Sequence, residues 1–349
     1  MTALRVPARP EQDASPRPVP WRRMAWVTWR QHRLALGGAV VLLGALAVWL
    51  WRVGSSAHHA YAAAAACHPA SSPACGILVG NFISYMSTGQ NIAIVLQVVP
   101  PLIGAFVGAP VLAREMETGT FRYAWTLGFG RWRWALAKLV LLGVTVTAAA
   151  GAFSLLFSWY YQPFFAQTFS GNVQIPLSTT VFDLRGVAFA AWTLAAFAIG
   201  ALAGMLIRRV VPALAVTLAV YAGLAVAAGA YLREHYLTPL LLKNGSVPGS
   251  AWVLSQQWYT KGGQPVSGTM LAQFLQQSAP QLAGGGKGGG IPQSPIVNQY
   301  LYQHGYALWT SYQPGSRFWP FQWIEGGWLL ALSALLIAAA VWLVRRRAS

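Results

Sequence analysis

Six long apolar stretches limit what this chain can fold into. A helix that crosses ~30 Å of hydrocarbon needs about 20 apolar residues. Each stretch has 18 to 23 residues and contains no Asp, Glu, Lys or Arg. They are Leu34–Trp51, Ile92–Ala113, Leu139–Trp159, Gly186–Ile207, Val210–Leu232 and Gly326–Val344. The pattern predicts an all-α polytopic membrane protein with six transmembrane helices and with no carboxylate inside a crossing.

The composition excludes the soluble classes of protein. Charged residues make up 9% of the 349 residues and apolar types 56%, whereas an ordinary soluble domain has roughly 25% charged residues. A disordered chain is excluded as well, because it combines low hydrophobicity with a high charge. The surface of the folded chain is therefore expected to contact membrane lipids.

The basic residues predict the orientation of the chain. Six crossings place segments 1–33, 114–138, 208–209 and 345–349 on one side, and these hold 17 of the 24 Lys and Arg residues. By the positive-inside rule both termini are cytoplasmic, in a multi-pass protein of the plasma membrane. A nucleic-acid partner would be another reason for the net charge of +17, but no basic run is longer than three residues. We therefore expect no nucleic acid as a partner.

The segment before the first crossing divides into two parts. Residues 1–19 are rich in Pro and charge, which predicts a flexible cytoplasmic tail. Residues 20–33 have a helical period, with apolar side chains on one face and arginines on the other, as in a helix that lies along the membrane surface. The apolar face holds Trp21, Met24, Ala25, Thr28 and Trp29, and the basic face Arg22, Arg23, Arg30 and Arg33. We predict an interfacial elbow helix; an ordinary basic flank is the alternative.

The rest of the chain divides at the crossings. Residues 34–232 contain transmembrane helices one to five, with a cytoplasmic loop at 114–138. Residues 233–325 form an external segment of 93 residues that is rich in turns and aromatic side chains and is long enough for a small cap domain. Residues 326–349 contain the sixth transmembrane helix and a basic cytoplasmic tail.

Both cysteines of the chain lie in residues 53–91, the predicted external loop between crossings one and two. Cys67 and Cys75 follow His58 and His59, and His68 lies between them, so a metal site is one interpretation. The spacing of seven residues between the cysteines matches no common zinc pattern. Two cysteines on the oxidising side of a membrane more often form a disulfide. We predict a disulfide and no metal, with free thiols as a further alternative.

The second crossing contains residues that interrupt a helix. Proline removes a backbone donor and kinks a helix, and such breaks in lipid occur where protein or a cavity satisfies the backbone. Gln97 is a polar residue in the same crossing, and Pro100, Pro101 and Pro110 follow it. The candidate residues of a substrate pathway are Gln97 and Phe106 here and Thr217 and Tyr221 in the fifth crossing, although simple helix packing is an equal interpretation.

Two pairs of glycines have the spacing of close helix packing. Gly104 and Gly108 lie in the second crossing, and Gly200 and Gly204 in the fourth. Small residues four apart let two helix backbones approach closely in a membrane. We predict that both pairs serve helix packing.

The cytoplasmic loop between crossings two and three holds two of the seven acidic residues of the chain. It begins Arg114-Glu-Met-Glu-Thr-Gly-Thr-Phe-Arg122, and Gly119 is a suitable residue for ending a short helix. One interpretation is a solvated loop with weak Glu–Arg pairs. The other is a docking element for a cytoplasmic partner with basic residues.

This loop resembles that of ABC transporter permease subunits of the type-two (exporter) family. Those proteins have six crossings, an N-terminal interfacial helix, cytoplasmic termini and the loop pattern R-E-x-E-x-G-T, followed by a basic segment and A-K. The matching residues are Arg114, Glu115, Glu117, Gly119 and Thr120, then Arg131 and Ala137-Lys138, with Arg122 inside the loop. The resemblance implies that the loop couples the chain to a separate ATPase through Glu115 and Glu117. The long external segment departs from the family.

The resemblance implies the transmembrane subunit of an ATP-driven exporter. The chain would form a dimer, most simply of two copies, with two cytoplasmic ABC ATPase subunits that use ATP and Mg²⁺. It would bind no cofactor and catalyse no reaction itself. Crossings without charge favour an apolar or amphipathic substrate. The alternative is a membrane-anchored sensor or enzyme with its activity in residues 233–325, although no known catalytic motif occurs there.

Overall fold

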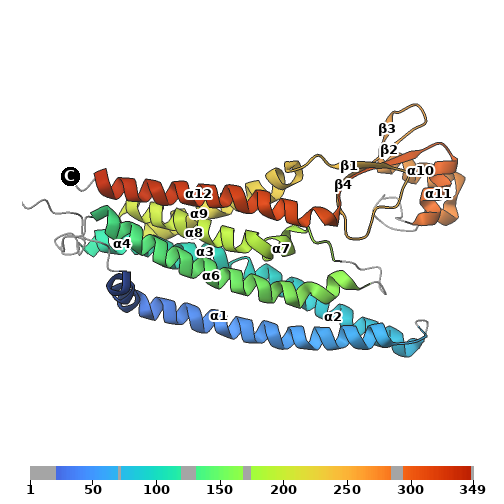
Figure 1. Ribbon diagram of the computed structural model, residues 1–349. Helices are drawn as coiled ribbons and strands as arrows, with labels where there is room; N and C mark the ends of the chain where they lie inside the picture. Colours follow the sequence, from blue (N-terminus) through green and yellow to red (C-terminus); the bar gives the residue numbers. More distant parts are fainter. Residues whose placement is uncertain (1–20, 70–71, 119–130, 168–173, 284–293, 347–349) are drawn as a thin grey trace, which may run out of the picture.

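The computed structural model describes residues 21–69, 72–118, 131–167, 174–283 and 294–346, and it is mostly helical (Figure 1). Long helices lie side by side in a bundle, and a small domain extends from one end. We call residues 240–317 the cap domain and the bundle end next to it the cap end. The opposite end, where the chain's C-terminus lies, is the terminal end.

Five helices in the described part of the chain are long and apolar enough to cross a membrane, which confirms the polytopic class. The first predicted crossing, Leu34–Trp51, lies within a sixth long helix; its role as a membrane span and the orientation of the chain stay predictions. The elements of the bundle are α1 (Trp21–Ala66), α2 (Pro73–Leu96), α3 (Val99–Ile103), the π-helical turn η1 (Gly104–Gly108), α4 (Ala109–Thr118), α6 (Arg131–Ala166), α7 (Thr179–Phe182), α8 (Gly186–Ile207), α9 (Val210–Ala227), the π-helical turn η2 (Ala228–Leu232), the 3₁₀ turn η3 (Arg233–His235) and α12 (Phe318–Arg346).

The first two helices are much longer than the sequence predicts. Helix α1 has 46 residues, about 69 Å at ~1.5 Å per residue, and α2 begins at Pro73. Residues 53–91, expected to be a loop, are therefore mostly helical. Cys67 and Cys75 are bonded to each other at the tip of this hairpin, whereas the His58 ring stacks on Trp159 in α6. The side chains of the predicted interfacial helix lie outside the described residues.

Helix α8 occupies the centre of the bundle. Its sequence is apolar all round, which is typical of a helix that is buried on every side. It contacts α12, α6, α4, η1 and α9. The glycine pairs make the contact with η1 and α4 unusually close: a Cβ on Gly200 would lie 2.2 Å from the Gly104 carbonyl oxygen. The prediction that both glycine pairs serve helix packing is confirmed.

The cap domain adds β-structure to the predicted helical class. Its four strands form one antiparallel sheet in the order β1-β4-β2-β3. The strands are β1 (Leu240–Lys243), β2 (Trp252–Tyr259), β3 (Pro265–Val266) and β4 (Ala307–Gln313), with α10 (Gly268–Ser278), the short turn η4 (Pro280–Leu282), α11 (Pro295–Gln303) and the turn η5 (Gly315–Arg317). Leu271, Leu275, Val297 and Leu301 form a small core between the two helices and the sheet. The chain passes from β4 through η5 directly into α12 (Figure 1).

Candidate functional site

An ion pair joins the two helices that flank residues 119–130 at the terminal end. The Lys138 Nζ atom in α6 lies 2.6 Å from the Glu115 Oε1 atom in α4. The Lys138 side chain is 2% exposed and that of Glu115 14%, so water screens the pair little. Lys138 also donates to the Val111 carbonyl in α4. The start of α6 is therefore fastened to α4.

A second contact joins the end of α4 to α9. The Glu117 Oε2 atom accepts a hydrogen bond of 3.2 Å from the Val210 backbone N–H, which is the first residue of α9. A carboxylate at a helix N-terminus binds an N–H group that has no partner within the helix and interacts favourably with the helix dipole. Glu117 is exposed, as is Arg114.

The predicted coupling residues therefore divide into three groups. Glu115 is engaged inside the chain with Lys138, so it is not a simple surface contact for a partner. Glu117 and Arg114 are on the surface at the end of α4. Gly119, Thr120 and Arg122 lie outside the described residues, and their predicted contact with an ATPase stays a prediction.

A second polar site lies at the cap end, inside the bundle. Glu325 in α12 is fully buried and binds Arg233, which is 1% exposed, through two hydrogen bonds of 2.8 and 3.0 Å. The same guanidinium binds the Asp183 carboxylate. One arginine thus serves two carboxylates, and the three side chains carry a formal net charge of −1. We call Asp183, Arg233 and Glu325 the buried triad.

Aromatic donors complete the binding of Glu325. The indole nitrogen of Trp192 in α8 donates to Glu325 Oε1 at 2.8 Å, and the Tyr236 hydroxyl donates to Oε2 at 3.2 Å. Trp328 donates to the Tyr236 oxygen in turn. A buried carboxylate requires this degree of pairing because its transfer from water is costly. The triad and its aromatic donors therefore join α8, α12 and the turn η3 after α9.

A small cavity of about 150 Å³ lies beside the triad. Two of the four predicted pathway residues, Gln97 and Tyr221, line it together with Asp183. Gln97 ends α2, and its amide donates to the carbonyls of Thr179 and Thr180. The remaining lining residues are Pro100, Leu184, Phe189, Trp192 and Ala225. This cavity is the candidate pathway site.

The other two predicted pathway residues lie elsewhere. The Phe106 side chain is 62% exposed on the bundle surface. Thr217 is buried, and its hydroxyl donates to the Ala213 carbonyl within α9. Neither residue lines the cavity, so the structure brings Gln97 and Tyr221 together and leaves Phe106 and Thr217 apart.

The electrostatics of Asp183, which lies between α7 and α8, differ from those of a surface aspartate. Burial raises the pKa of the Asp183 carboxyl to about 7, Arg233 opposes this shift, and the negative charge of Glu325 adds to it. Two carboxylates that share one cation cannot both be fully stabilised in the charged form. The raised pKa therefore favours the protonated form of the Asp183 carboxyl, which lies beside the cavity.

No sequence pattern predicted the triad, and the helix that holds Glu325 is longer than the sixth predicted crossing. Glu325 was placed outside the sixth crossing, but α12 begins at Phe318 and contains it. Arg233 directly follows the fifth predicted crossing. The available signal was the scarcity of acidic residues: four of only seven, Glu115, Glu117, Asp183 and Glu325, bind partners within the chain.

Comparison with known families decides the class of the chain. A family model described as ABC-2 membrane transporter related matches residues 40–233, which is more than half of the chain. The chain belongs to this family. It is a membrane permease component of an ABC transporter, a transport subunit rather than a catalytic one, and its family implies an ABC ATPase partner. The match ends where the cap domain is about to begin. Comparisons with curated proteins and with solved structures find no match.

Proposed function

We propose that this permease is the transmembrane subunit of an ATP-driven exporter and that residues 114–138 dock on its ATPase. The observation that carries the proposal is the double attachment at the terminal end. The Glu115–Lys138 pair and the Glu117–Val210 hydrogen bond fasten α4 to α6 and to α9. A force on residues 119–130 would therefore move three helices together rather than bend a loose loop.

Two irregularities along the same span would allow the helix to bend during this movement. The span from Pro73 to Glu117 is interrupted by the π-helical turn η1 and by the break at Gln97. π-Helical turns occur often at functional sites, and kinks occur at such turns and at prolines. A tilt of α4 would be absorbed at η1 and at Gln97, and Gln97 lines the cavity beside the triad. Nucleotide-driven tilting would thus change the cavity at the far end of the bundle.

The partners of the proposed exporter follow from the same scheme. The terminal end faces the cytoplasm, the ATPase binds ATP and Mg²⁺, and the permease binds neither. Two permease copies in the plasma membrane form the pathway between them. Helix α9 presents an apolar outer face, including Val211 at 75% and Val226 at 68% exposure, for lipid or the second copy. The cavity walls are mainly apolar and aromatic, which supports an apolar or amphipathic substrate.

Charge reversal at Glu117 tests the docking. The permease is purified with its ATPase, and association and substrate-stimulated ATP hydrolysis are measured for Glu117→Lys and Glu117→Gln. Glutamine keeps an acceptor oxygen for Val210, so it controls for the contact within the chain. We expect Glu117→Lys to weaken association at least about tenfold and Glu117→Gln to weaken it less. Unchanged association and hydrolysis in Glu117→Lys would contradict the proposal.

A further inference from the structure

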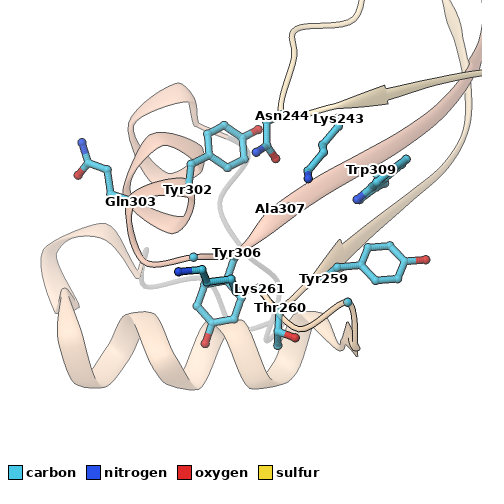
Figure 2. Close-up of a pocket in the computed structure, with 12 residues that line it drawn as sticks. Lys243, Asn244, Tyr259, Thr260, Lys261, Tyr302, Gln303, Tyr306, Ala307 and Trp309 are labelled. Carbon is cyan, nitrogen blue, oxygen red and sulfur yellow. The ribbon is translucent and has the colours of Figure 1, made fainter.

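The cap domain contains an open groove of about 720 Å³ (Figure 2). We call it the cap groove. It is lined by residues of β1, β2 and β4, of the turn after β2 and of the end of α11: Lys243, Asn244, Tyr259, Thr260, Lys261, Gly263, Tyr302, Gln303, Gly305, Tyr306, Ala307 and Trp309. Its volume is in the range of ~300–1,000 Å³ that is usual for small-molecule sites. The proposed transport function makes no use of it.

The sheet register builds the floor of the groove. Lys243 in β1 lies directly opposite Trp309 in β4, and directly opposed residues share one face of the sheet with their side chains in contact range. The Lys243 ammonium lies 5.7 Å from the centre of the Trp309 ring. The Tyr259 ring meets Trp309 edge to face, with ring centres 6.3 Å apart. Trp309 is 37% exposed, so an aromatic surface is open to a ligand.

The rim is held by residues with left-handed backbone conformations. Asn244, with φ of 56°, ends β1, and Gly263, with φ of 78°, lies in the turn between β2 and β3. Gly305, with φ of 85°, lies between the end of α11 and β4. The Asn244 Oδ1 atom accepts a hydrogen bond of 2.8 Å from the Leu308 backbone N–H, which fixes Asn244 against β4. The backbone conformation of these three residues and the Asn244–Leu308 hydrogen bond therefore place this part of the rim.

The charge of the groove has one sign. Lys243 and Lys261 line it, and none of the described residues that line it is acidic. Among the described residues, neither lysine has a carboxylate within ion-pair distance. Tyr302, Tyr306 and Thr260 line the same groove. Figure 2 shows the Lys243 side chain directed between Asn244 and Trp309, whereas the Gln303 amide points away from them. The groove thus holds two cations without a carboxylate partner among the described residues: Lys243 beside the Trp309 ring, and Lys261 in the turn after β2.

We propose that the cap groove binds an anionic saccharide, that is, a sugar ring that carries a carboxylate or phosphate group. The anionic group would pair with Lys243 and Lys261 in charge-assisted hydrogen bonds. The C–H face of the ring would stack on Trp309, and the sugar hydroxyls would bind Asn244 and the tyrosine hydroxyls. A simple anion would leave the aromatic floor unused, and a neutral sugar would leave both lysines unpaired.

Calorimetric titration of the full chain in detergent tests the groove. The probe is trigalacturonate, with maltotriose as the neutral sugar and citrate as the anion without a sugar ring. We expect trigalacturonate to bind at least about tenfold more tightly than either comparison compound. The double variant Lys243→Gln/Lys261→Gln should weaken this binding by about tenfold or more. Trp309→Ala should also weaken the binding of trigalacturonate. The lysine variant retains Trp309, so the two variants test the charged and the aromatic contacts separately.

A charge-matched control makes the result specific to the groove. Arg52→Gln/Arg345→Gln removes two positive charges from exposed positions outside the cap domain and should leave the affinity unchanged. The proposal is overturned if trigalacturonate does not bind, if maltotriose or citrate binds equally well, or if the control weakens binding as much as the lysine variant. These outcomes do not depend on the ATPase, so they are separate from the proposed transport function.

Discussion

Lys138 and Glu115, 23 residues apart in the chain, form an ion pair of 2.6 Å with the lysine almost completely buried. The pair closes the base of the segment that the sequence predicts to meet an ATPase. Removing one partner leaves the other charge buried and poorly satisfied, whereas an apolar replacement of both can be nearly neutral. The pair is therefore a sensitive point for both stability and coupling.

Lys138→Met should destabilise the permease because Glu115 then lacks its cation. We expect a loss on the order of 3–5 kcal/mol, discounted by the partial exposure of Glu115, and thus a melting temperature in detergent lower by about 5 °C or more. The double variant Lys138→Met/Glu115→Leu should recover most of the loss. Equal melting temperatures for the wild type and Lys138→Met would show that the ion pair does not contribute to the stability of the permease.

The close contact between η1, α4 and α8 should not tolerate an added methyl group. A Cβ at Gly200 would meet the Gly104 carbonyl oxygen at 2.2 Å, and backbone cannot move aside as a side chain can. Gly200→Ala should cost about 1–3 kcal/mol, measured as thermal stability in detergent. Gly223→Ala is the matched control, since nothing lies within 4 Å of its added Cβ. Equal effects of the two variants would refute the packing argument.

The stability of the permease should depend on pH through Asp183. Its folded pKa is raised from the ordinary value of 3.8 to about 7, so the folded state holds the proton more tightly than the unfolded state. The stabilisation from this group is full below about pH 4 and is lost as the pH rises through about 7.

The melting temperature in detergent, measured from pH 5 to pH 8, checks this dependence. It should fall for the wild type over this range. Asp183→Asn should remove most of the slope, because asparagine does not titrate. A wild-type melting temperature that rises with pH over the same range would contradict the assignment of a raised pKa.

The sequence predicted the innermost helices well and the polar sites poorly. The bounds of α8, Gly186–Ile207, agree with the prediction, because a central helix is apolar all round and ends at charged residues. Residues 53–91 were wrongly predicted to form a loop, because neither half of this segment has the pattern of a membrane span. The end of α1 is a run of alanines, the best helix formers, and this signal was available.

The buried triad escaped sequence analysis for a different reason. Arg233 and Glu325 are 92 residues apart and were used as boundaries of two crossings. Their pairing depends on the chain returning through the cap domain, which no local pattern reports. Similarly, Glu115 was predicted to be a surface carboxylate, but it forms an internal ion pair with Lys138. Helix α6 starts early enough to bring Lys138 alongside α4.

Site-specific crosslinking at position 120 tests the central claim most directly. A photoreactive residue replaces Thr120 in the full permease in its native membrane, with position 290 of the segment between crossings five and six as the control, and mass spectrometry identifies each adduct. We predict that position 120 crosslinks to a protein with the phosphate-binding loop and signature motif of an ABC ATPase, and that position 290 does not. An ATPase adduct at position 290, or none at position 120 while the ATPase co-purifies with the permease, would contradict the account.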